Sequence, residues 1–411
     1  MARPGPGNCR AMQIFDPAEH EPLVREAWDR ETARRFIAQF TREADDRYNR
    51  HEPGGWPLHR EDRYDAEQPR ESGVYCGTAG TIWAITHLAS LHGIALQHDY
   101  EAAIVQCEKA YRDNPAATGT VIPSYFRGTV GIMTAAYAVT GDPSILPRLA
   151  ADVASNAANP ARETMWGASG TALAALLIRE RDGDERFDED LRAVQNELWA
   201  TWRSAGDVGG LLWEQRVFGQ RRLYVGAAHG AIGNLAPFIR ASDLLTGQQL
   251  VTLDSRIAAL LSAYAIIDGD AANWVTIGHP REGNRLQWDH GAAGVILGLA
   301  RYPDHDELVE RLLRAGGEAI WRAGPVGKGP GICHGTAGNG FALLRLAKRT
   351  GDLVWQERAE QFAMAAMRQS EAWRSRFGLP SFSLWTGDAG VALFVDAVLR
   401  NDPRLLSLDL L

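Results

Sequence analysis

The chain has 411 residues, of which 45% are hydrophobic and 23% charged, a composition that is typical of a globular protein and excludes disorder as its main state. The formal net charge is -8 and no block of Lys and Arg occurs, so we expect no nucleic-acid partner. No apolar run is long enough to predict a transmembrane segment, and the start does not resemble a signal peptide, so we expect a cytoplasmic location.

Residues 1–70 precede the repeated part of the chain. A polar segment with two prolines at residues 16–24 is followed by a charged stretch with helical spacing that ends near Tyr48, and then by a Pro- and Gly-rich segment at residues 51–56. Such patterns mark helix starts and linkers. We therefore interpret residues 1–70 as an N-terminal helical extension and linker that packs on the main domain.

From residue 71 onward the chain repeats the step Gly-x-x-Gly, and each copy opens an apolar run that is compatible with a helix. The seven copies begin at Gly77, Gly128, Gly167, Gly230, Gly291, Gly335 and Gly387. Their spacings of 39 to 63 residues indicate a repeat architecture in which each unit is a helical hairpin. We therefore predict one domain over residues 71–411.

Two kinds of helix alternate within these repeats. The runs that follow the glycines, such as residues 81–88 and 391–398, are apolar on most faces and are predicted to be buried. The segments between them, such as residues 308–313 and 355–362, are apolar on one face only and should lie outside. The alternation predicts an all-α fold, a seven-fold double α/α barrel or toroid. We interpret the glycines as positions that need a positive φ or a close approach of two backbones.

The residue before each glycine pair is the most informative position of the repeat. Because every copy starts its inner helix at the same end of the barrel, these residues should converge on one mouth. In chain order they are Cys76, Arg127, Trp166, His229, His290, His334 and Thr386. Three successive His-Gly steps among only 11 histidines indicate a functional site at this mouth.

One of these steps carries a cysteine as well, Cys333-His334. The four cysteines of the chain are too widely spaced to predict a disulfide framework, so reduced thiols or a metal thiolate are expected. A thiolate next to an imidazole suits Zn²⁺, but a catalytic zinc ion normally takes three protein ligands. A third ligand must therefore come from elsewhere in the chain.

Three segments of the sequence resemble the signature segments of the lanthionine synthetase C-like (LanC-like) family. They are Tyr-Val-Gly-Ala-Ala-His-Gly at residues 224–230, Trp-Asp-His-Gly-Ala-Ala-Gly at residues 288–294 and Ile-Cys-His-Gly-Thr-Ala-Gly-Asn at residues 332–339. The segments at residues 75–80, 163–167 and 383–387 resemble the flanking repeats, so the resemblance spans about residues 75 to 400. It is strongest for the stand-alone eukaryotic-type branch.

The resemblance implies a seven-fold double α-barrel with zinc at its mouth, which forms thioethers by adding a thiol to dehydroalanine or dehydrobutyrine. Cys333 and His334 would be zinc ligands. The family pattern places the third ligand, a cysteine, where this chain has Asp289. A carboxylate can bind zinc, but it is a harder donor, so we expect weaker or slower thiol addition and a site open to other divalent ions. As an alternative, Asp289 caps its inner helix.

Four further positions are candidates for catalytic roles on the same resemblance. His229 would do acid–base work, or be a core histidine bonded to a carbonyl. Glu163 would orient His229 or the substrate amide, or cap its own helix. Arg285 would bind an enolate or a carboxylate, or be a solvated surface side chain. His290 would assist beside the ligands, or replace Asp289 as a ligand if the carboxylate points away.

Two positions are candidates for substrate binding. Lys328 resembles a lysine that contacts the thiol substrate in the eukaryotic-type branch, although it is equally a surface charge in a glycine-rich loop. Trp288, with Trp166 and Trp385, would wall the mouth, although core packing explains these rings as well. We interpret Cys76 as apolar packing.

The leading hypothesis is a zinc-dependent enzyme that adds glutathione or a peptide cysteine to a dehydrated peptide or protein. A separate dehydratase or kinase would then prepare the acceptor. The alternative is a catalytically degenerate LanC-like barrel that binds a modified peptide or a partner enzyme. A third hypothesis, an α/α-barrel glycosidase using Glu163 and Asp289, rests on fold analogy alone.

Overall fold

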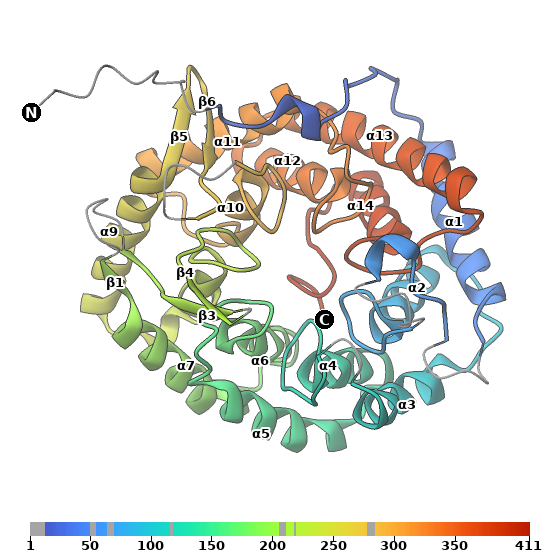
Figure 1. The fold of residues 1–411 in the computed structure, drawn as a ribbon, viewed down its shortest axis with the longest axis horizontal. Helices are drawn as coiled ribbons and strands as arrows, with labels where there is room; N and C mark the ends of the chain where they lie inside the picture. Colours follow the sequence, from blue (N-terminus) through green and yellow to red (C-terminus); the bar gives the residue numbers. More distant parts are fainter. Residues whose placement is uncertain are drawn as a thin grey trace, which may run out of the picture.

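The computed structural model describes residues 13–49, 55–63, 70–115, 118–204, 211–217, 219–277 and 284–411. The α-helices of these residues form two concentric rings (Figure 1). The inner ring consists of α2 (Thr78–His92), α4 (Thr129–Thr140), α6 (Ala168–Asp182), α8 (Ala236–Arg240), α10 (Ala292–Gly298), α12 (Thr336–Thr350) and α14 (Asp388–Arg400). The outer ring consists of α1 (Arg30–Asp46), α3 (Tyr100–Asp113), α5 (Leu146–Asn156), α7 (Asp188–Thr201), α9 (Gly247–Tyr264), α11 (Glu307–Ala323) and α13 (Leu353–Phe377). The predicted seven-fold double α/α barrel is confirmed.

Helix α1 comes from the segment that we interpret as an N-terminal extension. It packs against α14 and α2, the last and first helices of the inner ring (Figure 1). The segment thus contributes one helix of the outer ring itself. Residues 1–12, 50–54 and 64–69 of the extension lie outside the described residues.

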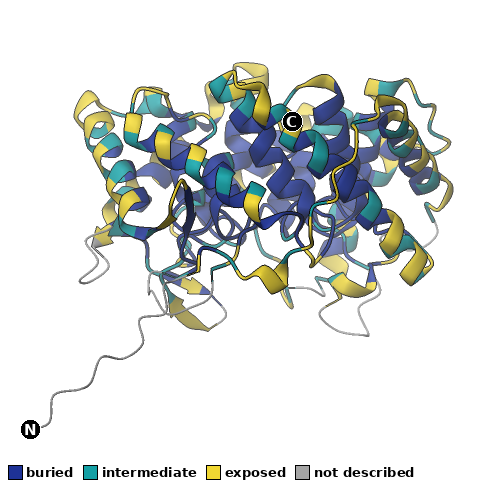
Figure 2. Ribbon diagram, turned by 90° about the horizontal axis from the view of Figure 1, so that it is seen from above, coloured by how far each residue is buried: buried dark blue, intermediate teal, exposed yellow. Residues whose placement is uncertain are grey.

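The two rings differ in how their helices are buried, as the sequence predicts (Figure 2). In α12 every residue from Thr336 to Leu346 is buried, and each fully buried Leu or Phe contributes about 1.5–3 kcal/mol to folding. In α11 the buried residues Val309, Leu313 and Ile320 lie on one face, and the helix starts at an aspartate cap, Asp306. The inner helices therefore form the core, while the outer helices cover it.

The Gly-x-x-Gly steps are explained by loops that fold back over the starts of the inner helices. Before α12, the backbone N–H of Thr336 donates to the carbonyl of Gly329 at 3.1 Å, so the loop satisfies an N–H group that the helix leaves free. A Cβ on Gly338 would overlap the carbonyl oxygen of Ile332. The same overlap with the carbonyl six residues earlier would occur at the second glycine of all seven steps. Among the seven first glycines only Gly291 has a positive φ, so close approach is the main reason for the motif.

Replacing Gly338 by alanine should therefore destabilise the protein. The overlap with the Ile332 carbonyl should cost about 3 kcal/mol, which exceeds the roughly 1 kcal/mol that alanine gains in helix propensity. The free energy of unfolding from urea titrations measures the difference. Gly247→Ala is the matched control, because no atom lies near its added Cβ, and its stability should be unchanged or slightly raised. Equal stabilities of the two variants would contradict this account of the motif.

The inner ring is less regular in its fourth and fifth repeats. Helix α8 is preceded by a 3₁₀ turn, Gly233–Leu235, because Pro237 has no N–H to donate to the carbonyl of Gly233. Three two-stranded antiparallel hairpins, which the sequence pattern did not predict, lie near these repeats in the described residues. They pair β1 (Arg203–Ser204) with β2 (Leu211–Leu212), β3 (Gln215–Val217) with β4 (Gln220–Arg222), and β5 (Ala265–Asp268) with β6 (Ala271–Trp274).

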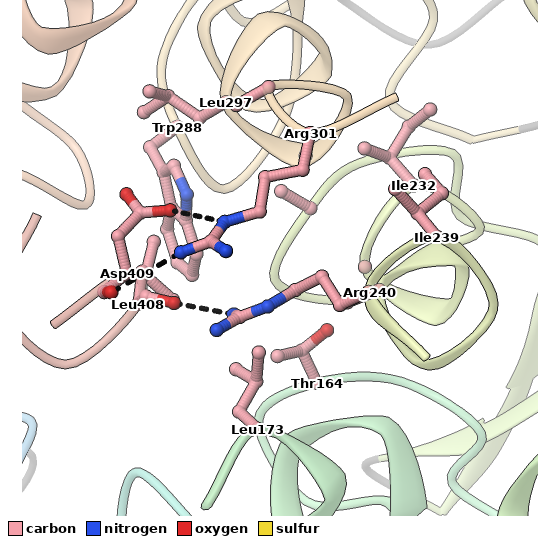
Figure 3. Close-up of a pocket in the computed structure, with 15 residues that line it drawn as sticks. Thr164, Leu173, Ile232, Ile239, Arg240, Trp288, Leu297, Arg301, Leu408 and Asp409 are labelled. Atoms are coloured by element: carbon pink, nitrogen blue, oxygen red, sulfur yellow. Dashed lines mark hydrogen bonds and ion pairs between the residues drawn. The ribbon is translucent and has the colours of Figure 1, made fainter. Parts of the chain in front are cut away.

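The last residues of the chain lie in the centre of the toroid (Figure 1). Arg240 donates to the carbonyl of Leu408 at 2.6 Å, and Arg301 lies 3.7 Å from the Asp409 carboxylate (Figure 3). A small cavity of about 60 Å³, lined mostly by apolar side chains, extends from this point along the inside of the ring to Trp288. Among the described residues, no helix combines the length and apolar character needed to cross a bilayer.

Candidate metal centre

The seven loops that precede the inner helices are joined into a circle by hydrogen bonds. Six of the seven links are backbone N–H to carbonyl bonds, and the remaining link is made by a serine hydroxyl. The links run from Tyr75 to Phe126, Ser124 to Met165, Thr164 to Ala228, Ala228 to Asp289, Asp289 to Cys333, Cys333 to Trp385 and Trp385 to Tyr75. Because each loop is tied to the next one around the ring, residues far apart in the sequence meet at this mouth.

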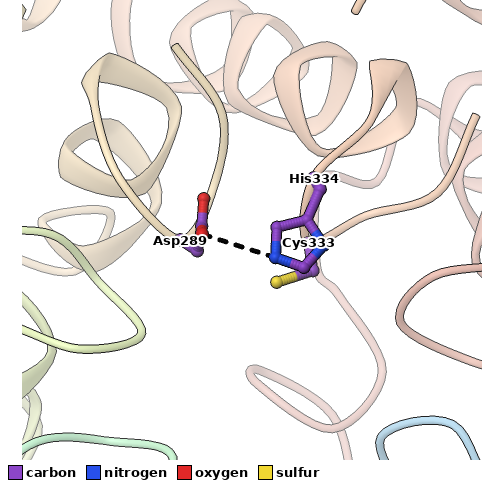
Figure 4. A group of neighbouring side chains, drawn as sticks. All are labelled: Asp289, Cys333 and His334. Atoms are coloured by element: carbon purple, nitrogen blue, oxygen red, sulfur yellow. Dashed lines mark ion pairs between the residues drawn. The ribbon is translucent and has the colours of Figure 1, made fainter. Parts of the chain in front are cut away.

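Asp289, Cys333 and His334 lie together at the mouth (Figure 4). Their potential ligand atoms are all within 4.8 Å of one another, and His334 Nε2 lies 3.4 Å from Asp289 Oδ2. Asp289 and Cys333 are buried, whereas 28% of the His334 side chain is exposed. These are the three residues that the sequence predicts as metal ligands, and the structure brings them together.

The donor set fits a zinc ion. Asp289 Oδ1 is buried without a hydrogen-bond partner, although a buried carboxylate oxygen needs one. Burial raises the pKa of the Cys333 thiol well above its usual value, and the charge of Asp289 adds to this, although a hydrogen bond from Tyr75 opposes it. A cation between these groups would stabilise the thiolate and satisfy the carboxylate. Three such donors are the usual protein ligands of a catalytic zinc.

Asp289 does not act as the helix cap that we considered as its alternative role. The N–H of Ala292, at the start of α10, donates to the side chain of Asn273 at 2.8 Å. Burial alone would raise the pKa of the Asp289 carboxyl, but the imidazoles of His290 and His334 beside it hold that pKa well below its usual range. The carboxylate is therefore ionised at neutral pH and faces His334.

His229, whose side chain is 20% exposed, pairs with the buried Glu163 next to this group. His229 Nδ1 lies 2.8 Å from Glu163 Oε2, and Glu163 also accepts hydrogen bonds from the N–H groups of Met165 and Trp166. Burial lowers the pKa of His229, but the hydrogen bond and charge of Glu163 outweigh it, so the pKa is raised overall. The imidazole is therefore suited to hold a proton near neutral pH.

His290 and Arg285 both lie near Asp289. Burial lowers the pKa of His290 to about 4, so this imidazole is neutral at pH 7. Its ring centroid lies 5.9 Å from that of His229, and its Nδ1 has no hydrogen-bond partner. Arg285 is half-exposed, with Nη1 3.9 Å from Asp289 Oδ2, and it can reach a molecule bound at the mouth.

Trp288 is the tryptophan that we predict to bind substrate. It is only 2% exposed and packs against Trp385, with ring centroids 4.4 Å apart. Its ring lies below the mouth, where it lines the small cavity on the inside of the barrel. Core packing, the alternative reading of this ring, accounts for its position, and a contact with substrate stays a prediction.

We call Asp289, Cys333 and His334 together the metal group. A larger cavity of about 290 Å³ adjoins this group, with His334 in its wall. Lys328, predicted to contact the thiol substrate, also lies in its wall. The other residues that line it are Glu61, Asp62, Arg63, Tyr75, Cys76, Gly329, Gly331, His334, Gly335, Trp373 and Thr386. The sequence did not point to Asp62 or to the Tyr75–Cys333 hydrogen bond. Asp62 lies outside the repeats, in a segment without a motif, so no local pattern could place it here.

Known proteins resemble this chain in sequence. A family model described as lanthionine synthetase C-like protein matches residues 31–410. LanC-like protein GCL1 from Arabidopsis thaliana is 37% identical over 255 residues, which are 59% of this chain and 56% of that protein. Glutathione S-transferase LANCL1 from Danio rerio is 32% identical over 181 residues, 43% of each chain. The aligned part therefore spans about half the length of these curated relatives.

Among solved structures, nisin cyclase resembles the chain with a TM-score of 0.61 and 17% sequence identity. The match covers 91% of this chain and 98% of nisin cyclase. At this level of identity the match establishes a shared fold.

Proposed function

The chain belongs to the lanthionine synthetase C-like protein family, and on that premise we propose that it adds a thiol to dehydroalanine or dehydrobutyrine residues of a peptide or protein, forming a thioether. The observation that carries the proposal is the meeting of Asp289, Cys333 and His334 at one mouth, beside the His229–Glu163 pair. These three residues would hold zinc, which when bound supplies the positive charge that keeps a substrate thiol ionised at neutral pH.

The proposed reaction needs one proton transfer from the protein. The sulfur of the thiolate bonds to the β-carbon, and the electron pair of the double bond moves to the α-carbon and its carbonyl as an enolate. We assign protonation of the α-carbon to the His229 imidazolium. Glu163 orients this ring and stabilises its charge. The thiol releases its proton to solvent when it ionises, and the His229 imidazole takes up one proton from solvent after the transfer, so the net reaction adds S–H across the double bond.

The other residues at the mouth would bind the substrates. Arg285, whose guanidinium is half-exposed, would bind the enolate oxygen or a carboxylate of the acceptor through two hydrogen bonds. Lys328 would bind the thiol substrate in the adjoining cavity. His290, buried beside His229, would position the Asp289 loop. The similarity to a protein named glutathione S-transferase supports glutathione as the thiol. A separate dehydratase or kinase would prepare the acceptor.

The proposed function is tested on the purified protein by metal analysis and by a thiol-addition assay. We expect one zinc ion per chain, and a mass increase equal to one thiol when glutathione and a dehydroalanine peptide are mixed with the protein. The assay without protein measures the spontaneous addition. Absence of stoichiometric zinc together with a rate equal to that spontaneous rate would overturn the proposal.

A second candidate function is a degenerate barrel that binds a modified peptide or a partner enzyme. It is favoured by Asp289, which stands where the family pattern has a ligand cysteine. The variant Asp289→Cys separates the two. If the aspartate is adapted, the wild type is active and Asp289→Cys binds zinc more tightly but reacts more slowly. If the barrel is degenerate, only Asp289→Cys is active. Asp289→Asn is the control, which should lose zinc. The family match leaves the glycosidase hypothesis without support.

A further inference from the structure

Asp62 is an acidic side chain in the cavity beside the metal group, and it has no structural task that requires a charge. It ends the short 3₁₀ turn η2 (Arg60–Asp62), which is capped at its start by His59. Asp62 Oδ2 accepts a hydrogen bond from the Ser383 hydroxyl at 3.1 Å, and the Thr386 hydroxyl is a second donor to this carboxylate. No ion pair joins Asp62 to a cation among the residues that the structure describes.

The hydroxyls around Asp62 hold its carboxylate in one orientation. Ser383 Oγ lies 2.7 Å from Thr386 Oγ1 and 3.1 Å from Ser381 Oγ, so the two donors are themselves fixed by neighbours. Burial raises the pKa of Asp62, and these hydroxyls offset the effect only in part. The imidazoles of His59 and His334 lie near this carboxylate and also lower its pKa, but neither forms an ion pair with it among the described residues. A carboxylate that is preoriented and has no ion-pair partner is suited to bind a positively charged group of a ligand.

Lys328 supplies the opposite charge in the wall of the same cavity. Its ammonium group has no ion pair with any acidic side chain in the described part of the chain. Arg63, the other cation in the wall, donates from Nε to the carbonyl of Leu58 at 3.1 Å. The cavity thus presents an acid and a base that lack charged partners, next to His334 of the metal group.

We propose that Asp62 is a specificity-determining residue that binds the ammonium group of the thiol substrate, while Lys328 binds a carboxylate of the same molecule. The substrate class is then a small thiol with a free ammonium and a free carboxylate, as in a short peptide with a free amino end. A cysteine inside a longer peptide carries neither charge. The volume of about 290 Å³ also suits a small molecule. The inference rests on the proposed function and narrows its thiol to this class.

The test compares glutathione with its desamino analogue, which lacks only the α-ammonium group, using a dehydroalanine peptide as acceptor. Asp62→Asn should raise the KM for glutathione by about 10- to 100-fold with kcat nearly unchanged, because one charge-assisted hydrogen bond is lost. The desamino thiol should have a high KM with the wild type, and Asp62→Asn should not raise it further. Glu101→Gln, at an exposed acid on the outer-ring helix α3 that does not line the cavity, is the control and should leave both KM values unchanged.

Binding of S-methylglutathione, measured by calorimetry, gives a readout that does not depend on thiol addition. The wild type and Glu101→Gln should bind it equally, and Asp62→Asn should bind it about 10- to 100-fold more weakly. Equal binding by the wild type and Asp62→Asn would overturn the role of Asp62, even if thioether forms at the normal rate. If the wild type had equal KM values for glutathione and its desamino analogue, this result alone would overturn the role of Asp62. Absence of thioether from every thiol would refute the proposed function, while calorimetry would still decide the role of Asp62.

Discussion

Replacement of Cys333 by serine is expected to remove zinc from the purified protein and to abolish thioether formation. Cys333 is buried and lies within 4.8 Å of the ligand atoms of Asp289 and His334, so its thiolate would be the strongest donor of the three. A serine hydroxyl stays protonated at neutral pH and binds zinc poorly. The two remaining ligands do not hold a catalytic zinc ion, which takes three.

The zinc content of each variant, measured by elemental analysis after dialysis, checks this prediction. Cys76→Ser is the matched control, because Cys76 is also buried at the mouth but does not belong to the metal group. It should keep one zinc ion per chain. A Cys333→Ser protein that retains stoichiometric zinc would refute the assigned ligand set. Thermal unfolding of both variants shows whether any loss of zinc follows from loss of the fold.

Replacement of His229 by asparagine should lower kcat for thioether formation by about 10²- to 10⁴-fold, the usual contribution of a positioned acid or base. Its pKa is raised because the hydrogen bond and charge of Glu163 outweigh the effect of burial. The protonated form therefore persists to a higher pH than in a free imidazole. The rate should fall as the pH rises through the pKa of His229, since the proton required at the α-carbon is then missing.

The pH dependence of kcat separates this role from a purely structural one. Glu163→Gln removes the charge that raises the His229 pKa, so the alkaline fall in rate should move to lower pH. His305→Asn is the control, because His305 is exposed and pairs with Asp254, with 3.2 Å between its Nε2 and Asp254 Oδ2. Its profile should match that of the wild type. An alkaline limb that stays in place in Glu163→Gln would argue against His229 as the proton donor.

The site divides into two sides about the metal group. On one side, in the proposed reaction, His229, Glu163 and Arg285 would supply proton transfer and stabilise charge on the acceptor. On the other, the cavity with Asp62 and Lys328 adjoins His334 and has room for a thiol. Under the proposed function, the two substrates would then approach the metal ligands from different directions. This arrangement would also allow changes in thiol specificity without changes in the residues that handle the proton.

The sequence by itself determined the barrel and the position of the site on it. Apolar runs that are hydrophobic on most faces can only be buried, and amphipathic runs must cover them, so the local pattern decides which ring a helix joins. The repeated Gly-x-x-Gly steps marked the loops at one mouth, and Cys333-His334 marked the metal group there. These features depend on residues close together in the sequence, which is why they could be predicted.

Only the tertiary structure decided which side chains face the site. It directed Asp289 toward His334 instead of the start of α10, buried Trp288 below the mouth, and brought Asp62 from the N-terminal segment into the cavity. Such orientations are set by hydrogen bonds and packing between loops that are distant in the sequence, such as the bond from Asp289 to Cys333. No local periodicity encodes them, because each depends on where a separate part of the chain comes to lie.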